Sequence, residues 1–289
     1  MAMRTVLVSV SGAEGSKVLL NSAFHLAKDL DAHLQVLHVR TDPRETIPLL
    51  GEGMSIGMID DMTRIAEEEC DSCQTRARSY YDECLIKYTA QETNNPTAAG
   101  KTVSWTEMRG REDEIVSRLG RLADLIVLSR PNVEAEVGHT LVLNSALFET
   151  GRPVLVVPPT GMEEIGKKVV ISWNGSAQSA RAVSSALPIL KNADEVNVFT
   201  IESKRTPGEM SAGVFEYMAC HGINCSVRTL AGSGSGASVG EELLKEAAVV
   251  AADMIVMGAY THSRMRQLIL GGVTRHVLEQ SNLPLLMAH

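Results

Sequence analysis

The segment 257–278, MGAYTHSRMRQLILGGVTRHVL, combines residue types that suit the binding of an anion. Gly258 ends an apolar run, so the backbone there can approach a ligand closely. Gly271 and Gly272 then open a stretch with helical spacing, and a helix N-terminus binds phosphate through oriented N–H groups and its dipole. The connection between them carries His262, Arg264 and Arg266. Together these features favour a negatively charged group as ligand, while each alone also fits a long surface connection.

The elements that must position this segment form one of two copies of a repeated pattern. RTVLVSVSG (4–12) aligns with KKVVISWNGS (167–176), with Ser11 opposite Asn174. Each run predicts a strand, and each is followed by a predicted helix and a second predicted strand. The helices are expected at 16–30 and 177–191, and the strands at 33–39 and 195–201.

The ends of the two copies also correspond. The apolar runs 122–130 and 251–259 match, as do 152–159 and 283–289. One predicted helix, 112–123, leads into the run 122–130, and another, 240–252, leads into the run 251–259. Both are expected to have acidic first turns, as the helix dipole prefers. Strands that alternate with helices predict α/β units with parallel sheets covered on both faces. We therefore expect two tandem open parallel-sheet domains of the Rossmann-like class, at 1–160 and 166–289.

The first copy is longer because of an insertion at about 44–100. It contains GEGMSIGMIDDM, a long charged helix expected to begin near Met62, and a polar loop, QETNNPTAAG (91–100). The methionines fit flexible packing, or alternatively a lid or partner surface.

The repeat and the glycine spacing together resemble the universal stress protein family across both halves of the chain. Nucleotide-binding members have a glycine at the end of strand four, then two residues and a second glycine, then nine residues and Gly-Ser or Gly-Thr. Gly258, Thr261 and Gly271-Gly272 match that spacing, although Thr261 replaces the second glycine and Gly272 stands where Ser or Thr is usual. Asn174 replaces the Asp that nucleotide binders usually carry after strand one, so the amide keeps an acceptor oxygen and loses the charge.

The resemblance implies that the second half binds an adenine nucleotide, with ATP the first candidate, and leaves open whether Mg²⁺ accompanies it. In an open α/β sheet the ligand lies beyond the carboxyl ends of the strands. Ile201 and Met257 are expected to form an apolar wall for the purine. The expected binding residues are Asn174, Ile201, Met257, Gly258, Thr261, His262, Arg264, Gly271, Gly272, Val273 and Thr274.

Other loops carry weaker signals. In the first half Arg130, Pro131 and Asn132 replace the Gly-x-x-Gly pattern, and only Gly138 lies near the following helix start, so this copy is interpreted as having lost its pocket. The glycine-rich segment 230–242 lacks the Gly-Lys-Ser/Thr ending of a P-loop. It is predicted to be a flexible loop in which Ser233, Ser235 or Ser238 contacts phosphate.

Composition excludes several classes of protein. The net charge of −8 argues against broad binding of nucleic acid or anionic membrane. No uncharged apolar stretch approaches the roughly 18 residues that span a bilayer, and the start of the sequence shows no secretion leader. The chain is therefore predicted to be cytoplasmic.

Three functions remain open at this stage. The first is a stress-response nucleotide binder with at most slow ATP hydrolysis, because no catalytic motif such as Gly-x-Ser-x-Gly is present. The second is a nucleotide-free interaction protein with unidentified protein partners. The family resemblance implies pairing through the last strands, PVLVV and PLLMA, within a chain or in a homodimer. The third is a zinc or redox protein that uses the Cys70 and Cys73 spacing together with Cys220, His221 or Cys225.

Overall fold

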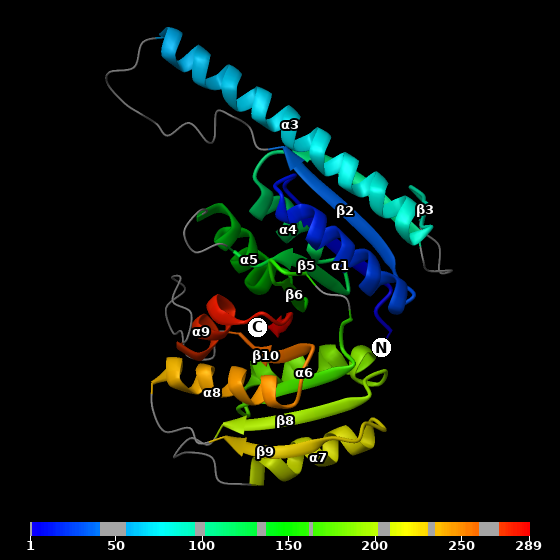
Figure 1. Ribbon diagram of the computed structural model, residues 1–289, viewed down its shortest axis with the longest axis vertical. Helices are drawn as coiled ribbons and strands as arrows, with labels where there is room; N and C mark the ends of the chain where they lie inside the picture. Colours follow the sequence, from blue (N-terminus) through cyan, green and yellow to red (C-terminus); the bar gives the residue numbers. More distant parts are fainter. Residues whose placement is uncertain are drawn as a thin grey trace.

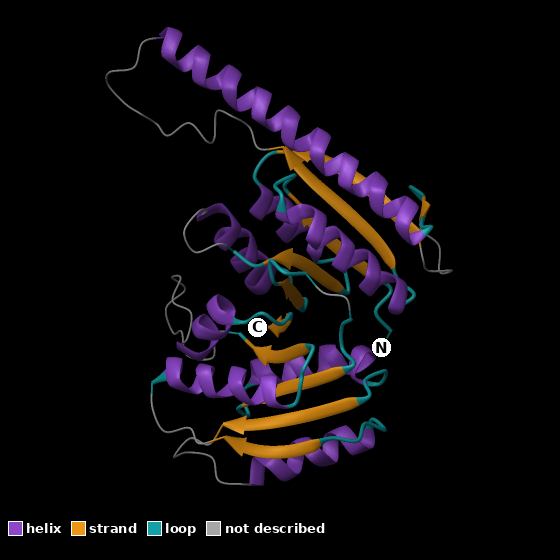
Figure 2. Ribbon diagram, viewed as in Figure 1, coloured by secondary structure: helices purple, strands orange, loops and turns teal. Residues whose placement is uncertain are grey.

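The computed structural model describes residues 2–40, 56–95, 102–131, 137–161, 164–201, 209–230, 235–259 and 272–289 (Figures 1 and 2). Thr261, His262, Arg264, Gly271 and Ser233 lie outside these ranges, and of Ile201 the backbone alone is described. The remaining predicted site residues can be placed.

Both halves follow the predicted β-α-β-α-β-α-β-α-β order, and the first half has one extra short strand. Its elements are β1 (Thr5–Val10), α1 (Gly15–Asp29), β2 (His33–Arg40), α3 (Ile56–Tyr88), β3 (Gln91–Glu92), β4 (Thr102–Arg109), α4 (Glu112–Gly120), β5 (Leu125–Ser129), α5 (Val137–Glu149) and β6 (Val154–Val157). Those of the second half are β7 (Lys168–Trp173), α6 (Ala177–Leu190), β8 (Glu195–Ile201), α7 (Glu209–Cys220), β9 (Ser226–Leu230), α8 (Gly236–Val249), β10 (Met254–Gly258), α9 (Gly272–Gln280) and β11 (Leu285–Ala288).

The strands form one mixed sheet that passes through both halves, in the order β3-β4-β2-β1-β5-β6-β11-β10-β7-β8-β9. Within each half every pair is parallel, whereas β6 and β11 pair antiparallel, with Leu286 opposite Leu155. The last strands of the two halves thus join within the chain, and both are inner strands of the sheet. The predicted fold class is confirmed.

Helices cover both faces of the sheet, as continuous aliphatic strands require. On one face α1, α3, α6 and α7 pack on a core that includes Leu20, Tyr81 and Val183. On the other face α4, α5, α8 and α9 pack on a core that includes Leu143, Phe199 and Leu243. Successive crossovers therefore leave β7 and β10 toward opposite faces, which makes the β7–β10 boundary a switch point of the second half.

Three predictions about individual elements were wrong. Helix α8 begins at Gly236 rather than near residue 240, because Ser235 caps its N-terminus, so its first turn contains no acidic residue. The long helix of the insertion begins at Ile56, ahead of Met62. Gln91 and Glu92, expected in a loop, add a short strand beside β4. By contrast, α4 has the predicted acidic first turn.

A membrane-spanning helix is not found: within the ranges that can be described, every helix is too short or too polar to cross a bilayer.

Candidate functional site

The carboxyl ends of β7, β8 and β10 meet at one edge of the second half, which we call the rear rim. At the end of β7, Asn174 Oδ1 accepts a hydrogen bond of 3.1 Å from the Ser176 backbone N–H, and Gly175 adopts φ +70°. Ser176 then caps α6, because its side chain accepts a 3.1 Å hydrogen bond from the Ser179 N–H. This tight turn starts α6 directly at the rim, and the amide oxygen of Asn174 shapes the turn.

Gly258, at the end of β10, faces the first turn of α6. A Cβ added at Gly258 would lie 2.6 Å from the backbone nitrogen of Ser179 and 2.8 Å from the carbonyl carbon of Gln178. These are backbone atoms that cannot move without shifting the helix, so packing alone requires glycine here. The glycine has the consequence that the N-terminus of α6 sits against the end of β10.

Met257 lies one residue earlier and is 3% exposed. Its side chain belongs to the core on the α8 and α9 face, together with Phe199 and Leu230. The structure therefore places it beneath the rim, where it supports the strand end, and not as an open apolar wall.

The start of α9 lies against the start of α8. A Cβ added at Gly236 would lie 2.7 Å from Gly272 Cα, and one at Gly240 would lie 2.9 Å from the His276 ring. Glycines one helical turn apart on α8 thus let the backbone of α9 approach closely. The Gly-x-x-x-Gly spacing in GASVG (236–240) was a signal of this contact, and the sequence reasoning missed it.

Val273 and Thr274 continue α9 below this contact. Val273 is half-buried and packs on the core, and Thr274 is 5% exposed. Ser235 and Ser238, suggested as phosphate contacts, cap α8: the Ser235 hydroxyl accepts from the Ser238 N–H at 3.3 Å, and the Ser238 hydroxyl donates to the Ser235 carbonyl at 2.8 Å.

Three helices therefore begin at the rear rim, on both faces of the sheet. α6 begins beside Gly258 on one face, and α8 and α9 begin side by side on the other. Each N-terminus carries about half a positive charge and outward N–H groups. The arrangement suits an anion at the switch point.

The matching edge of the first half, which we call the front rim, has the same local turn but a different neighbour. The Ala13 N–H donates to the Ser11 hydroxyl at 3.4 Å, as Ser176 does to Asn174, and Gly12 adopts φ +81°. Here, however, a Cβ on Gly12 would lie 2.0 Å from the carbonyl oxygen of Cys73 on α3. The insertion helix fills the space next to the strand end.

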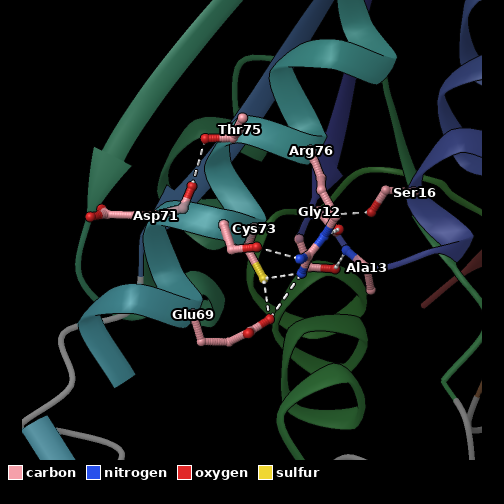
Figure 3. Close-up of polar contacts among 10 residues, drawn as sticks. Gly12, Ala13, Ser16, Glu69, Asp71, Cys73, Thr75 and Arg76 are labelled. Carbon is pink, nitrogen blue, oxygen red and sulfur yellow. Dashed lines mark hydrogen bonds and ion pairs between the residues drawn. The ribbon is translucent and has the colours of Figure 1, made fainter. Parts of the chain in front are cut away.

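Polar contacts fix α3 in that place (Figure 3). Arg76 Nε donates to the Gly12 carbonyl at 3.0 Å, and Arg76 Nη2 lies 2.9 Å from Glu69 Oε1. Further along the same edge, Arg40 pairs with Asp71 and donates to Gln74 at 2.6 Å. The ends of β1 and β2 are thus both tied to α3, and no sequence signal identified these partners.

The metal interpretation finds no support in this arrangement. Among the described residues, no group of three or more His, Cys, Asp or Glu side chains could hold a metal ion. All five cysteines are free thiols. Burial and the hydrogen bond to Glu69 raise the pKa of the Cys73 thiol, and burial raises that of Cys84 to about 11. Both thiols are therefore protonated at neutral pH, which disfavours metal binding and nucleophilic chemistry.

Comparisons with known proteins find one family in both the family model and a full-length relative. The model of the universal stress protein family matches residues 233–289. The universal stress protein Slr1230 of Synechocystis sp. is 22% identical over 295 residues, which cover 98% of this chain and 99% of the relative. The chain is thus similar to a universal stress protein over nearly its full length.

Solved structures extend the likeness in fold to the full length. A universal stress protein from Archaeoglobus fulgidus superposes with a TM-score of 0.65 at 17% identity, covering 100% of this chain and 99% of the other. A functionally unknown protein from Pseudomonas aeruginosa gives 0.57 at 14% identity, with 99% and 92% covered. The resemblance to universal stress proteins with two tandem copies of the fold, stated from the sequence, is confirmed.

Proposed function

We propose that the chain is a stress-response protein that binds an adenine nucleotide, ATP foremost, at the rear rim, with little or no catalysis. The observation that carries the proposal is that α6 begins against Gly258 on one face of the sheet, while α8 and α9 begin side by side on the other face. The connection from β10 to α9 supplies His262, Arg264 and Arg266, the basic residues that a polyphosphate requires. We propose 1–160 and 166–289 as the two domains.

The residues at the rim fit a nucleotide better than they fit a protein-bound metal. The Asn174 oxygen is used in the turn to Ser176, and an amide carries no charge to hold Mg²⁺. If Mg²⁺ accompanies ATP, the phosphates are its principal ligands. The purine would lie near the ends of β7 and β8, next to Asn174 and Ile201.

The test replaces Arg264 and Arg266 by alanine and measures ATP affinity by isothermal titration calorimetry. Each charge-assisted hydrogen bond to phosphate is worth about 1.5–3 kcal/mol, so losing one or both lowers affinity by roughly tenfold or more. The control is Lys245→Ala, which removes one positive charge from an exposed position on α8, about 14 Å along the helix from Gly236. Equal affinity in the double variant and the control would place the site elsewhere.

Substitutions of Gly258 or Gly272 are less suitable tests. A side chain at Gly258 collides with the backbone of Ser179, and one at Gly272 crowds Gly236, whether or not a ligand binds. A loss of ATP binding in such variants would report displaced helices.

The alternative is a nucleotide-free interaction protein. The last strands β6 and β11 already pair with each other inside the chain, so their edges are occupied. A homodimer would therefore use another surface. If the wild-type chain shows no ATP binding, this alternative replaces the first.

A further inference from the structure

A crevice of about 330 Å³, which we call the junction crevice, lies where the two halves of the chain meet. Its walls come from the residues just before β6, the end of β11 and one side of α6. Val154 pairs with Met287 in the antiparallel β6–β11 ladder, so the start of β6 lies beside the end of the chain. The volume falls within the range of about 300–1,000 Å³ that small-molecule sites have. The polar residues that line the crevice are Arg152, Arg181, Ser184, Ser185 and His289.

The two arginines line the crevice from opposite halves of the chain. Arg152 Nε and Nη2 both donate to the Arg121 carbonyl, at 3.1 and 2.9 Å, which fixes the guanidinium and leaves Nη1 for another acceptor. Arg181 is exposed and makes no hydrogen bond or ion pair with any residue that the structure describes. By contrast, Arg40 and Arg78 each pair with a carboxylate. The crevice therefore presents two positive charges that its walls do not neutralise, in a chain whose net charge is −8.

The remaining walls bring no acidic side chain to the crevice. The terminal carboxylate of His289 forms no ion pair with Arg152 or Arg181. The His289 ring is held at Nδ1, 3.1 Å from the Ala259 carbonyl, and packs edge-on against Phe148 with ring centroids 4.5 Å apart. Because a carbonyl oxygen only accepts, Nδ1 carries the proton in this contact. The imidazole is thus a fixed part of the wall.

Two hydroxyl groups stand beside Arg181 on α6. Ser184 and Ser185 follow it at i+3 and i+4, which places the three side chains on one side of the helix. Neither hydroxyl is hydrogen-bonded to a residue in the described part of the chain. Both can therefore donate to a ligand that the arginines attract.

We propose that the junction crevice binds a small phosphate monoester, with its phosphate between Arg152 and Arg181. A phosphate group carries three strong acceptor oxygens, whereas a carboxylate carries two, and guanidinium groups bind phosphate through paired N–H donors. Two guanidinium groups and two hydroxyls match the larger number of acceptors. The volume of the crevice leaves room for a small organic group beside the phosphate. The residues that form this site differ from those proposed for the nucleotide.

The test titrates the full chain with glycerol 1-phosphate in a calorimeter at fixed ionic strength. Wild type is expected to bind one molecule per chain, and to bind acetate more weakly by about tenfold or more. Arg181→Gln removes a charged donor, so it should weaken glycerol phosphate binding by about tenfold. The matched control is Arg64→Gln, which removes an exposed arginine of α3 and should change this affinity by less than about twofold.

A second pair of measurements separates this site from the nucleotide site. Arg181→Gln should leave ATP affinity unchanged, and the Arg264→Ala and Arg266→Ala double variant should still bind glycerol phosphate. Arg152→Gln should weaken glycerol phosphate binding in the same direction as Arg181→Gln. Circular dichroism and melting temperatures would confirm that each variant is folded, and Arg181→Gln, at an exposed position without a partner among the described residues, keeps the test independent of stability.

Three results would overturn the proposal. One is equal glycerol phosphate affinity in R181Q and R64Q, which would place the phosphate elsewhere. Another is loss of glycerol phosphate binding in R264A/R266A, which would assign the phosphate to the nucleotide site. The third is binding of acetate or chloride as tightly as glycerol phosphate, which would mean an adventitious ion only.

Discussion

The front and rear rims start from the same turn and differ in what lies against it. Ser11 and Asn174 each accept a hydrogen bond from the backbone two residues on, and Gly12 and Gly175 both adopt positive φ. At the front rim the backbone of Cys73 touches Gly12, and Arg76 donates to its carbonyl. At the rear rim the first turn of α6 lies against Gly258, and the start of α9 lies against the start of α8. One repeated fold thus serves internal packing at one rim and, we propose, a ligand at the other.

The difference arises from the insertion. In the second half the short helix α7 occupies the position that α3 has in the first half, and its twelve residues compare with thirty-three. The extra length of α3 carries Cys73 and Arg76 across the ends of β1 and β2. Contacts within the chain at a rim stabilise the folded protein permanently. A rim that binds a ligand adds stability only when the ligand is present.

The largest expected effect is that of Gly12→Ala. The new Cβ would overlap the Cys73 carbonyl and hold alanine at φ +81°, so we expect the free energy of unfolding to fall by about 2–4 kcal/mol. Urea denaturation measures it. Gly15→Ala is the control, because its Cβ meets open space on α1 and should gain up to about 1 kcal/mol. Equal stability of G12A and wild type would mean that α3 does not close on the front rim.

Arg76→Ala should have the next largest effect. It removes the hydrogen bond to Gly12 and the pair with Glu69, and because the side chain is partly exposed we expect the free energy of unfolding to fall by less than in Gly12→Ala. Hydrogen exchange should rise at residues 11–16 and along α3. Arg64→Ala, on the same helix, breaks exposed pairs within α3 and should cost less than about 0.5 kcal/mol. Similar exchange in both variants would mean that Arg76 does not hold α3 against the front rim.

Asn174→Asp sharpens the comparison at the level of binding. Aspartate keeps the acceptor for the Ser176 N–H, so the free energy of unfolding should change by less than about 0.5 kcal/mol. The added carboxylate should make ATP affinity depend on Mg²⁺, measured by calorimetry with and without the ion. Ser11→Asp places the same charge at the front rim and should leave ATP binding unchanged. If ATP affinity became dependent on Mg²⁺ in Ser11→Asp and not in Asn174→Asp, the nucleotide site would lie at the front rim.

The smallest effect concerns pH. His33 is buried at the start of β2, where its ring contacts the hydroxyls of Thr102 at 2.8 Å and Ser104 at 3.0 Å, and burial lowers its pKa. The unfolded chain then takes up the proton more readily, so stability should fall as pH drops below about 6.5. The equivalent residue of the second half is the exposed Glu195, so the front half should be the sensitive one. In His33→Gln the free energy of unfolding should fall less steeply as pH drops below about 6.5. An unchanged slope would mean that other titrating groups cause the decline.

The sequence predicted the architecture because local patterns repeat. The strands after Arg4 and Lys167, the helices that follow, and the matching chain ends all came from apolar spacing that each segment carries by itself. The long helix of the insertion was also predicted, although its start at Ile56 was missed.

Contacts between distant residues were not predictable in the same way. Nothing in Gly12 indicates that Cys73 will meet it, and the close approach of Gly236 to Gly272 depends on how two helices cross. For this reason Gly258 and Gly272 were interpreted as ligand-facing, and the sequence did not indicate that Gly258 also packs on α6 and Gly272 on α8. Thr261, His262, Arg264 and Gly271 lie outside the described residues, and their role stays a prediction.

The most direct test of the asymmetry between the rims is the stoichiometry of ATP binding to the full chain, measured by equilibrium dialysis with labelled nucleotide. The account predicts one ATP per chain, lost in the Arg264→Ala and Arg266→Ala double variant and retained in Arg76→Ala. Two ATP per chain would show that the front rim is open, and none would show that neither rim is a nucleotide site.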